Sequence, residues 1–227
     1  MLKKLTSLVF GGTCFLCKGA ARDILCEGCN ADLPRLPPAL CPRCALESPG
    51  SAVCGRCLAR APQYDGTIAA LSYAFPADAL VHALKFRSEL ALAPFLAGLL
   101  SERLLPEHAV DCVVPVPLSA KRLRERGYNQ AAEIARALAS AMRLRVELEL
   151  CKRRRDTPAQ IDLPWAERER NVRGAFASSR LVEGASIAVV DDVMTTGATL
   201  DEIAATFKRA GARRVVNWVV ARTFPPA

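Results

Sequence analysis

Two adjacent carboxylates, followed by a loop of small and hydroxylated residues, are the part of this sequence best suited to chemistry. Asp191 and Asp192 follow the apolar run at 187–190, and the loop that comes two residues later consists of Thr195, Thr196, Gly197, Ala198 and Thr199. A loop that opens a helix presents backbone N–H groups and the positive end of the helix dipole to an anion. Carboxylates repel phosphate, but they suit sugar hydroxyls and a divalent cation. The pattern therefore predicts a phosphorylated ribose as ligand.

The elements around this loop are predicted from hydrophobic spacing. The run at 187–190 is typical of a short buried strand, bounded by Gly184 and by the acids. After the loop, apolar residues recur at helical spacing on one face: Leu200, Ile203, Ala204 and Phe207. Gly211 stands where a helix C-terminal cap would lie. The loop is therefore expected to join the carboxyl end of a strand to the start of a helix.

A second strand and its exit loop predict a site for a more highly charged phosphate group. The buried strand at 111–114 ends in the proline-rich loop at 115–118, and four cations follow: Lys121, Arg122, Arg124 and Arg126. Prolines stop the strand and stiffen its exit, and a guanidinium can bind two phosphate oxygens at once. We expect Arg122 and Arg126 to contact a pyrophosphate, ahead of a helix at about 129–143.

The segment at 151–176 is long, polar and interrupted by proline, which is typical of a mobile loop. A cationic flap that closes over a phosphate-rich substrate would exclude water and neutralise the leaving group. The candidates are Arg153 and Arg155, with Thr157 and Gln160 beside them. An arginine in such a charged run can also lie on a solvated surface.

Eight of the ten cysteines form four C-x-x-C pairs near the amino terminus: Cys14/Cys17, Cys26/Cys29, Cys41/Cys44 and Cys54/Cys57. One such pair places two thiolates on a tetrahedral ion, and two pairs complete a four-cysteine zinc site. Sequential pairing predicts two zinc ribbons, at 14–29 and 41–57. Because all four ligand positions would be cysteine, the zinc would be structural.

Other uses of these cysteines stay open. Disulfides require an oxidising compartment. An iron–sulfur cluster takes the same ligands, and redox C-x-x-C pairs usually occur singly in a different context. The pairs could also interleave, or only one site could hold zinc. Cys112 and Cys151 stand alone beside apolar residues and are expected to be buried as small hydrophobes.

Length and charge set further bounds. A chain of 227 residues can hold one domain and a small module. The boundary is expected at 59–65, followed by a strand at 67–73 and helices at 77–86 and 90–105. The net charge is +8, and 119–173 has fourteen Lys/Arg against eight Asp/Glu, which would attract phosphates. The basic patch at 84–87 could be part of that attraction or only a solvated helix end.

The amino terminus is not predicted to be a signal peptide. Its apolar part, at 5–10, is short, and an amphipathic helix leading into the cysteines fits better. No apolar span is long enough to cross a membrane. We therefore expect a cytoplasmic protein with an open α/β sheet that binds its ligand at the carboxyl ends of the strands.

The segment at 189–200 resembles the phosphoribosyl pyrophosphate (PRPP) signature of type I phosphoribosyltransferases. Further along the chain, V-P-V-P-L, K-R-x-R-x-R-G-Y-N-Q, R-x-R-x-T-P-x-Q-x-x-L, E-R-x-x-N-V-x-G-A-F and D-D-V-M-T-T-G-A-T occur in order behind the C-x-x-C pairs. Together they are similar to the ComF family of zinc-ribbon, phosphoribosyltransferase-like proteins linked to DNA uptake and competence. The resemblance covers nearly the whole chain.

This resemblance implies a double zinc-ribbon module at 1–60 and a type I phosphoribosyltransferase-like domain at 61–227. That domain would have a parallel sheet flanked by helices, with a hood from 61–110. It also implies that Asp191 and Asp192 hold the ribose hydroxyls, that the threonine loop holds the 5′-phosphate, and that Mg²⁺ accompanies PRPP. Arg153 and Arg155 would act from the flap as pyrophosphate leaves.

Two functions remain in competition at this stage. One is a phosphoribosyltransferase whose acceptor the sequence does not name, and the retained acid pair and flap arginines tilt the balance toward it. The other is a non-catalytic protein that handles single-stranded DNA or regulates, using the same pocket and the zinc ribbons. Partners of the second kind would be single-stranded DNA and the DNA-uptake machinery.

Overall fold

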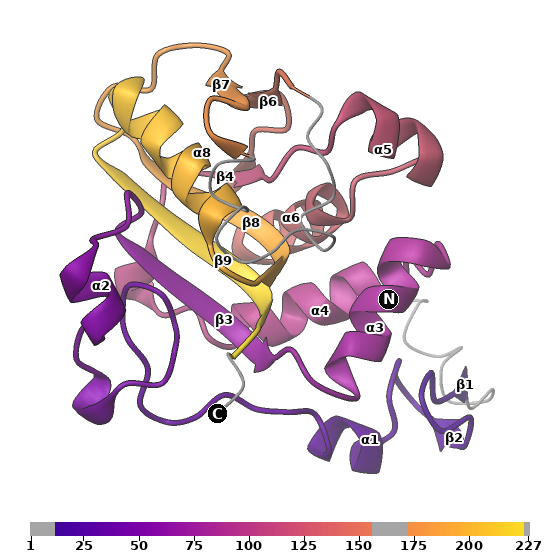
Figure 1. The fold of residues 1–227 in the computed structure, drawn as a ribbon. Helices are drawn as coiled ribbons and strands as arrows, with labels where there is room; N and C mark the ends of the chain where they lie inside the picture. Colours follow the sequence, from indigo (N-terminus) through magenta and orange to yellow (C-terminus); the bar gives the residue numbers. More distant parts are fainter. Residues whose placement is uncertain (1–11, 156–171, 225–227) are drawn as a thin grey trace.

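The computed structural model describes residues 12–155 and 172–224 and centres on one parallel sheet (Figure 1). Its five strands lie in the order β3–β9–β8–β4–β5, and every neighbouring pair is parallel. The strands are β3 (Gly66–Ser72), β4 (Cys112–Pro115), β5 (Arg145–Val146), β8 (Ser186–Met194) and β9 (Arg214–Arg222). All carboxyl ends therefore meet at one edge, and the predicted α/β sheet is confirmed.

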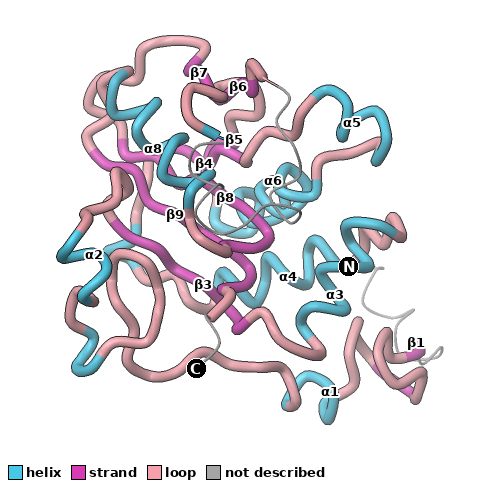
Figure 2. Tube along the Cα trace, viewed as in Figure 1, coloured by secondary structure: helices cyan, strands magenta, loops and turns pink. Residues whose placement is uncertain are grey.

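Helices cover both faces of this sheet (Figure 2). They are α3 (Ala77–Phe86), α4 (Leu92–Ser101), α5 (Ala120–Arg126), α6 (Gln130–Met142) and α8 (Ala198–Arg209). Side chains alternate along a strand, so Ala188 and Val190 of β8 pack in the core formed with α3, α4 and α6. Ile187 and Val189 pack in a second core with α8. Burial of both faces explains why the strands are nearly continuous apolar runs.

The two cysteine ribbons join different cores. The first contains β1 (Gly12–Thr13), β2 (Ala20–Ala21) and α1 (Glu27–Ala31), and its buried residues belong to the core of α3, α4 and α6. The second contains a 3₁₀ turn at Pro49–Ser51 and α2 (Gly55–Ala59), and its buried cysteines belong to the core of α8. Figure 1 shows α1 and α2 at well-separated places beside the sheet.

The predicted flap begins and ends in a short antiparallel hairpin. Strand β6 (Cys151–Arg153) pairs with β7 (Phe176–Ser178). Thr157 and Gln160 lie outside the described residues, as does the helix expected at 5–10. Cys112 and Cys151 are buried as expected, with 3% and 2% of their surfaces exposed.

Three elements differ from the sequence analysis. Strand β9 was not anticipated, although the apolar run at 215–221 follows the Gly211 turn directly. The cations after β4 lie on helix α5, which the N-cap Ser119 begins by accepting a hydrogen bond from the Arg122 N–H at 3.3 Å. Strand β8 continues through both acids to Met194, because β9 pairs with it over that length.

Within residues 12–155 and 172–224, the structure contains no helix with the length and apolar character needed to cross a membrane. A second 3₁₀ turn, Pro106–His108, lies between α4 and β4.

Candidate functional site

The acid pair lies near the carboxyl end of β8, the central strand of the sheet, between β9 and β4. Asp191 is partly buried and Asp192 is buried. The Asp192 N–H donates to Asp191 Oδ1 at 2.9 Å. The Nζ of Lys85, at the end of α3, lies 3.0 Å from Asp192 Oδ2. A cation from helix α3 therefore stabilises the acid pair of strand β8.

The electrostatics of this cluster follow from burial and proximity. Burial, and then the neighbouring Asp192 carboxylate, raise the pKa of Asp191 well above its usual value, against a smaller opposing effect of Lys85. Burial works to lower the pKa of Lys85, but Asp192 and Asp191 outweigh it, so the net shift of that pKa is upward. The cluster therefore favours the charged form of Lys85 and disfavours the ionised form of Asp191.

Lys85 lies at the candidate site, and the sequence analysis left its role open. It sits in the basic patch at 84–87, where the bland alternative was a solvated helix end. In the structure only 21% of its side chain is exposed, and it points to the acid pair. The available signal was its spacing in α3, one residue after the buried Leu84 and four after the buried Val81.

The threonine loop turns from β8 into α8 through Gly197, whose φ of +86° favours glycine. The Ala198 N–H donates to Thr196 Oγ1 at 3.1 Å, which tightens the turn. Within the described residues, no hydrogen bond takes up the backbone N–H of Thr195, Thr196 or Gly197. Free N–H groups ahead of a helix N-terminus form the kind of cradle that binds an anion.

The two arginines expected at a pyrophosphate share one face of α5, because they are four residues apart. Arg122 and Arg126 line a cavity of about 260 Å³ whose other wall includes Lys85 and Phe86. The Arg126 guanidinium lies 5.2 Å from the Phe86 ring centroid. The Tyr128 hydroxyl also donates to the Leu84 carbonyl, which joins the end of α3 to the α5–α6 turn. Lys85 thus links the acid pair to this cationic cavity.

The flap arginines are not brought to the acid pair by the contacts that the structure describes. Arg155 Nη2 donates to the Arg173 carbonyl at 2.6 Å, across the base of the segment. Arg153 Nε donates to the Arg155 carbonyl at 3.3 Å, and its guanidinium lies 5.5 Å from the Phe176 ring centroid. These contacts lie at the base of the β6–β7 segment. The action of Arg153 and Arg155 on a leaving group stays a prediction.

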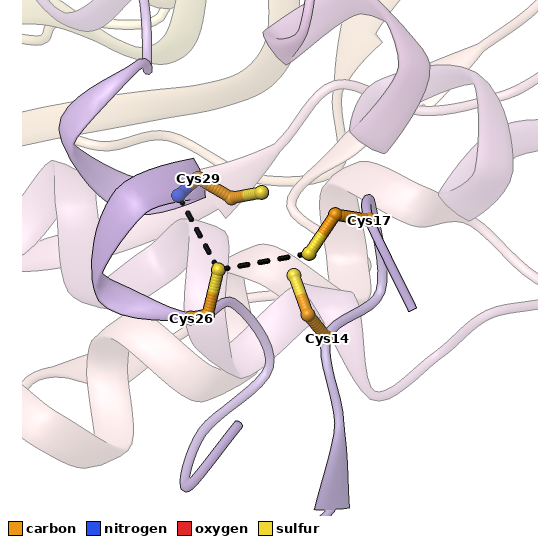
Figure 3. A group of neighbouring side chains, drawn as sticks. All are labelled: Cys14, Cys17, Cys26 and Cys29. Carbon is orange, nitrogen blue, oxygen red and sulfur yellow. Dashed lines mark hydrogen bonds between the residues drawn. The ribbon is translucent and has the colours of Figure 1, made fainter. Parts of the chain in front are cut away.

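The eight paired cysteines gather in two groups of four, in the sequential order predicted. In each group the sulfur atoms lie within 4.8 Å of one another. Figure 3 shows Cys14, Cys17, Cys26 and Cys29 pointing toward a common centre, with the Cys29 N–H donating to Cys26 Sγ at 3.5 Å. Four convergent thiols fit a tetrahedral zinc ion, so the donor set suits structural zinc at both places.

Backbone N–H groups prepare one thiol in each group for metal binding. Burial works to raise the pKa of Cys41, but N–H groups of Cys54, Cys44 and Arg43 lower it to about 7. The Cys54 N–H lies 3.3 Å from Cys41 Sγ. In the first group the pKa of Cys14 falls to about 6, against the effect of burial, through N–H groups that include that of Cys17. Thiolates are the form that zinc binds.

Comparison with known proteins covers both parts of the chain. A family model described as "Double zinc ribbon domain" matches residues 5–58. The DNA utilization protein YhgH of Escherichia coli K12 is 33% identical over 226 residues, which cover 95% of this chain and 99% of that protein. Competence protein F of Haemophilus influenzae is 30% identical over 226 residues, 94% of this chain and 98% of that protein.

Among solved structures, the glutamine PRPP amidotransferase from B. subtilis, complexed with ADP and GMP, is 25% identical over the matched part. The match covers 55% of this chain and 25% of that chain, with a TM-score of 0.38. A likeness this partial supports no conclusion about the site.

Proposed function

Since this chain belongs to the ComF family, we propose that it is a phosphoribosyltransferase-like protein of DNA uptake or use that binds PRPP, or another ribose 5-phosphate group, together with Mg²⁺. The observation that carries the proposal is the linkage at one sheet edge. The acid pair of β8 contacts Lys85, and Lys85 lines the cavity of Arg122 and Arg126. Sugar hydroxyls and a diphosphate need such groups side by side.

The threonine loop supports the same ligand from the other side. Its unpaired N–H groups and the N-terminus of α8 suit the 5′-phosphate. Asp191 and Asp192 would accept hydrogen bonds from the 2′- and 3′-hydroxyls of the ribose. Those hydrogen bonds would offset burial and the Asp192 carboxylate, the two causes that raise the pKa of Asp191. Lys85 would then be available to the diphosphate.

The donor set fits Mg²⁺ only when a ligand shares in its coordination. Two carboxylates stand together, but in the described ranges the only groups of three or more metal-binding side chains are the cysteine groups. Mg²⁺ is commonly held by one or two carboxylates together with substrate phosphates. Asp191 and Asp192 would hold it through the ribose hydroxyls. When bound, the ion would neutralise charge on the departing pyrophosphate.

For turnover, the residues of this chain have separate tasks. The loop and the acid pair fix the two ends of the ribose, so that its anomeric carbon faces the incoming acceptor. Arg122, Arg126 and Lys85 stabilise negative charge that builds on pyrophosphate as its bond to the ribose breaks. We assign Arg153 and Arg155 to the flap that excludes water during that step. The acceptor stays open.

A second function is binding without turnover, which the position of the flap arginines favours. The hydrogen bonds described for Arg153 and Arg155 lie at the base of the β6–β7 segment. Relatives are named for DNA utilization and competence. In this case the pocket would grip a phosphorylated end of single-stranded DNA or a regulatory nucleotide.

The test is a titration of PRPP with Mg²⁺ into the purified protein, followed by calorimetry. The double variant Asp191→Asn/Asp192→Asn should lose binding. Glu133→Gln serves as the matched control, because this half-buried glutamate of α6 pairs with Arg136 and does not line the cationic cavity. Binding that is equally tight in the acid-pair variant would contradict the proposed site.

Catalysis and binding are separated by pyrophosphate release. The protein is incubated with PRPP, Mg²⁺ and purine, pyrimidine and amine acceptors, with and without single-stranded DNA. Release above the protein-free rate with any acceptor supports the transferase. A flat result across the panel, with PRPP binding intact, supports binding without turnover.

A further inference from the structure

Arg222, the last residue of β9, connects the second cysteine group to the threonine loop. Its side chain is fully buried. Its Nε donates to the Cys44 carbonyl at 2.8 Å, and its Nη1 donates to the Met194 carbonyl at 2.9 Å and also to the Thr195 carbonyl. One guanidinium therefore spans from a zinc knuckle to the start of the loop.

The surroundings of Arg222 are unusual for a buried cation. Among the described residues no carboxylate pairs with it, although a buried charge is costly without an opposite charge. Its Nη2 is buried and has no hydrogen-bond partner there. The cysteine group beside it would bear a net charge of −2 when four thiolates hold one Zn²⁺. A metal-loaded group would thus supply the counter-charge that Arg222 lacks among the described carboxylates.

A second link joins the same ribbon to the next peptide of the loop. Arg56, inside the Cys54-x-x-Cys57 knuckle, donates through Nη2 to the Thr196 carbonyl at 3.4 Å. Tyr64 backs the turn itself, because a Cβ at Gly197 would lie 3.1 Å from the Tyr64 hydroxyl oxygen. Arg43 of the other knuckle holds Tyr64 in turn, by donating to its carbonyl at 3.3 Å.

These contacts determine where the loop N–H groups point. In a planar trans peptide the carbonyl and the following N–H point in opposite directions. The carbonyls of Met194, Thr195 and Thr196 are drawn to the second ribbon by Arg222 and Arg56. The N–H groups of Thr195, Thr196 and Gly197 must therefore point away from the ribbon. These are the three N–H groups that have no partner among the described residues.

The first cysteine group offers a natural contrast. Hydrogen bonds from residues 12–32 stay inside that ribbon, within the part of the chain that the structure describes. Its Lys18, which follows the first knuckle, donates to the Phe15 carbonyl at 2.8 Å. Its attachment to the domain is apolar, in the core of α3, α4 and α6.

We propose that the second cysteine group is a positioning element for the threonine loop, with Arg222 as the link and Arg56 as its aid. Arg222 and Arg56 fix the consecutive carbonyls of Met194, Thr195 and Thr196, and thereby aim the N–H groups that would receive a phosphate. Zinc bound to the four cysteines would hold these two arginines in place. The effect on loop order stands by itself. The effect on ligand affinity rests on the proposed function.

The primary test measures amide hydrogen exchange of Ala198, Asp201 and Thr223, whose N–H groups donate to the loop or to the end of β8, in the full-length, zinc-loaded protein without ligand. Arg222→Lys keeps the charge but loses the planar fork. We expect exchange there to rise at least about tenfold, which corresponds to about 1.4 kcal/mol of local opening, while zinc content stays at the wild-type value. Lys18→Ala is the matched control in the first ribbon and should leave these amides unchanged. Unchanged exchange in a zinc-loaded Arg222→Lys would overturn the proposal.

Two further arms keep the test decisive if Arg222→Lys does not fold. Arg56→Ala alters an exposed side chain and should raise exchange of Ala198, whose N–H donates to Thr196 Oγ1, by a smaller factor. Limited removal of zinc from the unaltered protein with a chelator should raise exchange of Ala198, Asp201 and Thr223 before it affects β4. Exchange that rises first in β4, or equally in both, would also overturn it.

Ligand affinity is measured separately with PRPP and Mg²⁺. Arg222→Lys should weaken binding at least about tenfold relative to the wild type. If the wild type binds no PRPP while the exchange results are as expected, the proposed ligand is wrong and the positioning role stands. If the wild type binds PRPP and Arg222→Lys binds equally with unchanged exchange, the positioning role is wrong.

Discussion

The two cysteine groups have the same ligands and similar spacing, but they are joined to the domain by different physics. The first meets the core of α3, α4 and α6 through apolar side chains such as Leu25 and Leu33. The second is joined by directed hydrogen bonds, through Arg222 and Arg56, to the carbonyls of the threonine loop. Apolar packing tolerates small shifts, whereas hydrogen bonds fix orientation. A motif repeated in the sequence can thus serve packing at one position and alignment at the other.

The largest expected effect comes from removing one cysteine ligand of the second group. Cys41→Ser should abolish zinc binding by the second group and lower the unfolding free energy by more than ~4 kcal/mol, because loss of a metal is among the few single-site causes of that size. Phosphoribosyl ligand binding should be lost as well. Zinc analysis, thermal unfolding and calorimetry measure the three effects.

Cys17→Ser in the first group is the comparison. It should also release zinc, but the folded fraction should bind PRPP within about threefold of the wild type, because no described hydrogen bond links that ribbon to the loop. Equal losses of affinity in the two variants would contradict the difference between the groups.

The next largest effect on stability concerns Lys85 of α3, one of the helices that the first ribbon packs against. Lys85→Met leaves two adjacent carboxylates without their nearby cation, and breaking a largely buried ion pair in this way costs about 3 kcal/mol. Urea unfolding without divalent ions measures it. Lys121→Met provides the control, since Lys121 forms only an exposed pair with Glu125 and should change stability by less than about 0.5 kcal/mol. A similar loss of unfolding free energy in both variants would contradict the role of Lys85 in stabilising the acid pair.

The sequence predicted most of what local patterns determine. The acid pair, the loop and the cysteine groups occupy contiguous stretches, and the strand and helix around the loop follow simple periodicities. Lys85 was undecided, because its meaning depends on where α3 ends relative to β8, more than a hundred residues later. Arg222 gave no signal at all, since an arginine after an apolar strand usually marks its exposed end. Only the tertiary structure shows that its side chain lies between the second cysteine group and the threonine loop.

A third effect tests the cationic cavity on α5. Arg126→Ala should weaken PRPP binding about tenfold, because a charge-assisted hydrogen bond contributes about 1.5–3 kcal/mol. Arg124→Ala, on the same helix but outside the cavity lining, should weaken it by less than about twofold. Calorimetry of the two variants at one ionic strength makes the comparison. Equal weakening would reduce the role of α5 to general positive charge.

The smallest effect has the opposite sign, and it concerns Asp191. Its folded-state pKa is raised by burial and by Asp192, so the folded state holds its proton more tightly than the unfolded state does. The contribution of this group to stability is present in acid and is lost as pH rises from the usual carboxyl range through the raised pKa. Asp191→Asn should remove this loss and stabilise the ligand-free protein near neutral pH by about 1 kcal/mol, or about 2–4 °C, while the benefit shrinks toward acid. Thermal unfolding across that pH range, with Glu133→Gln as control, measures it. A variant that is less stable than the wild type at neutral pH would mean that Asp191 is already satisfied without a ligand, and that the acid pair is not strained in readiness for the hydroxyls of a sugar.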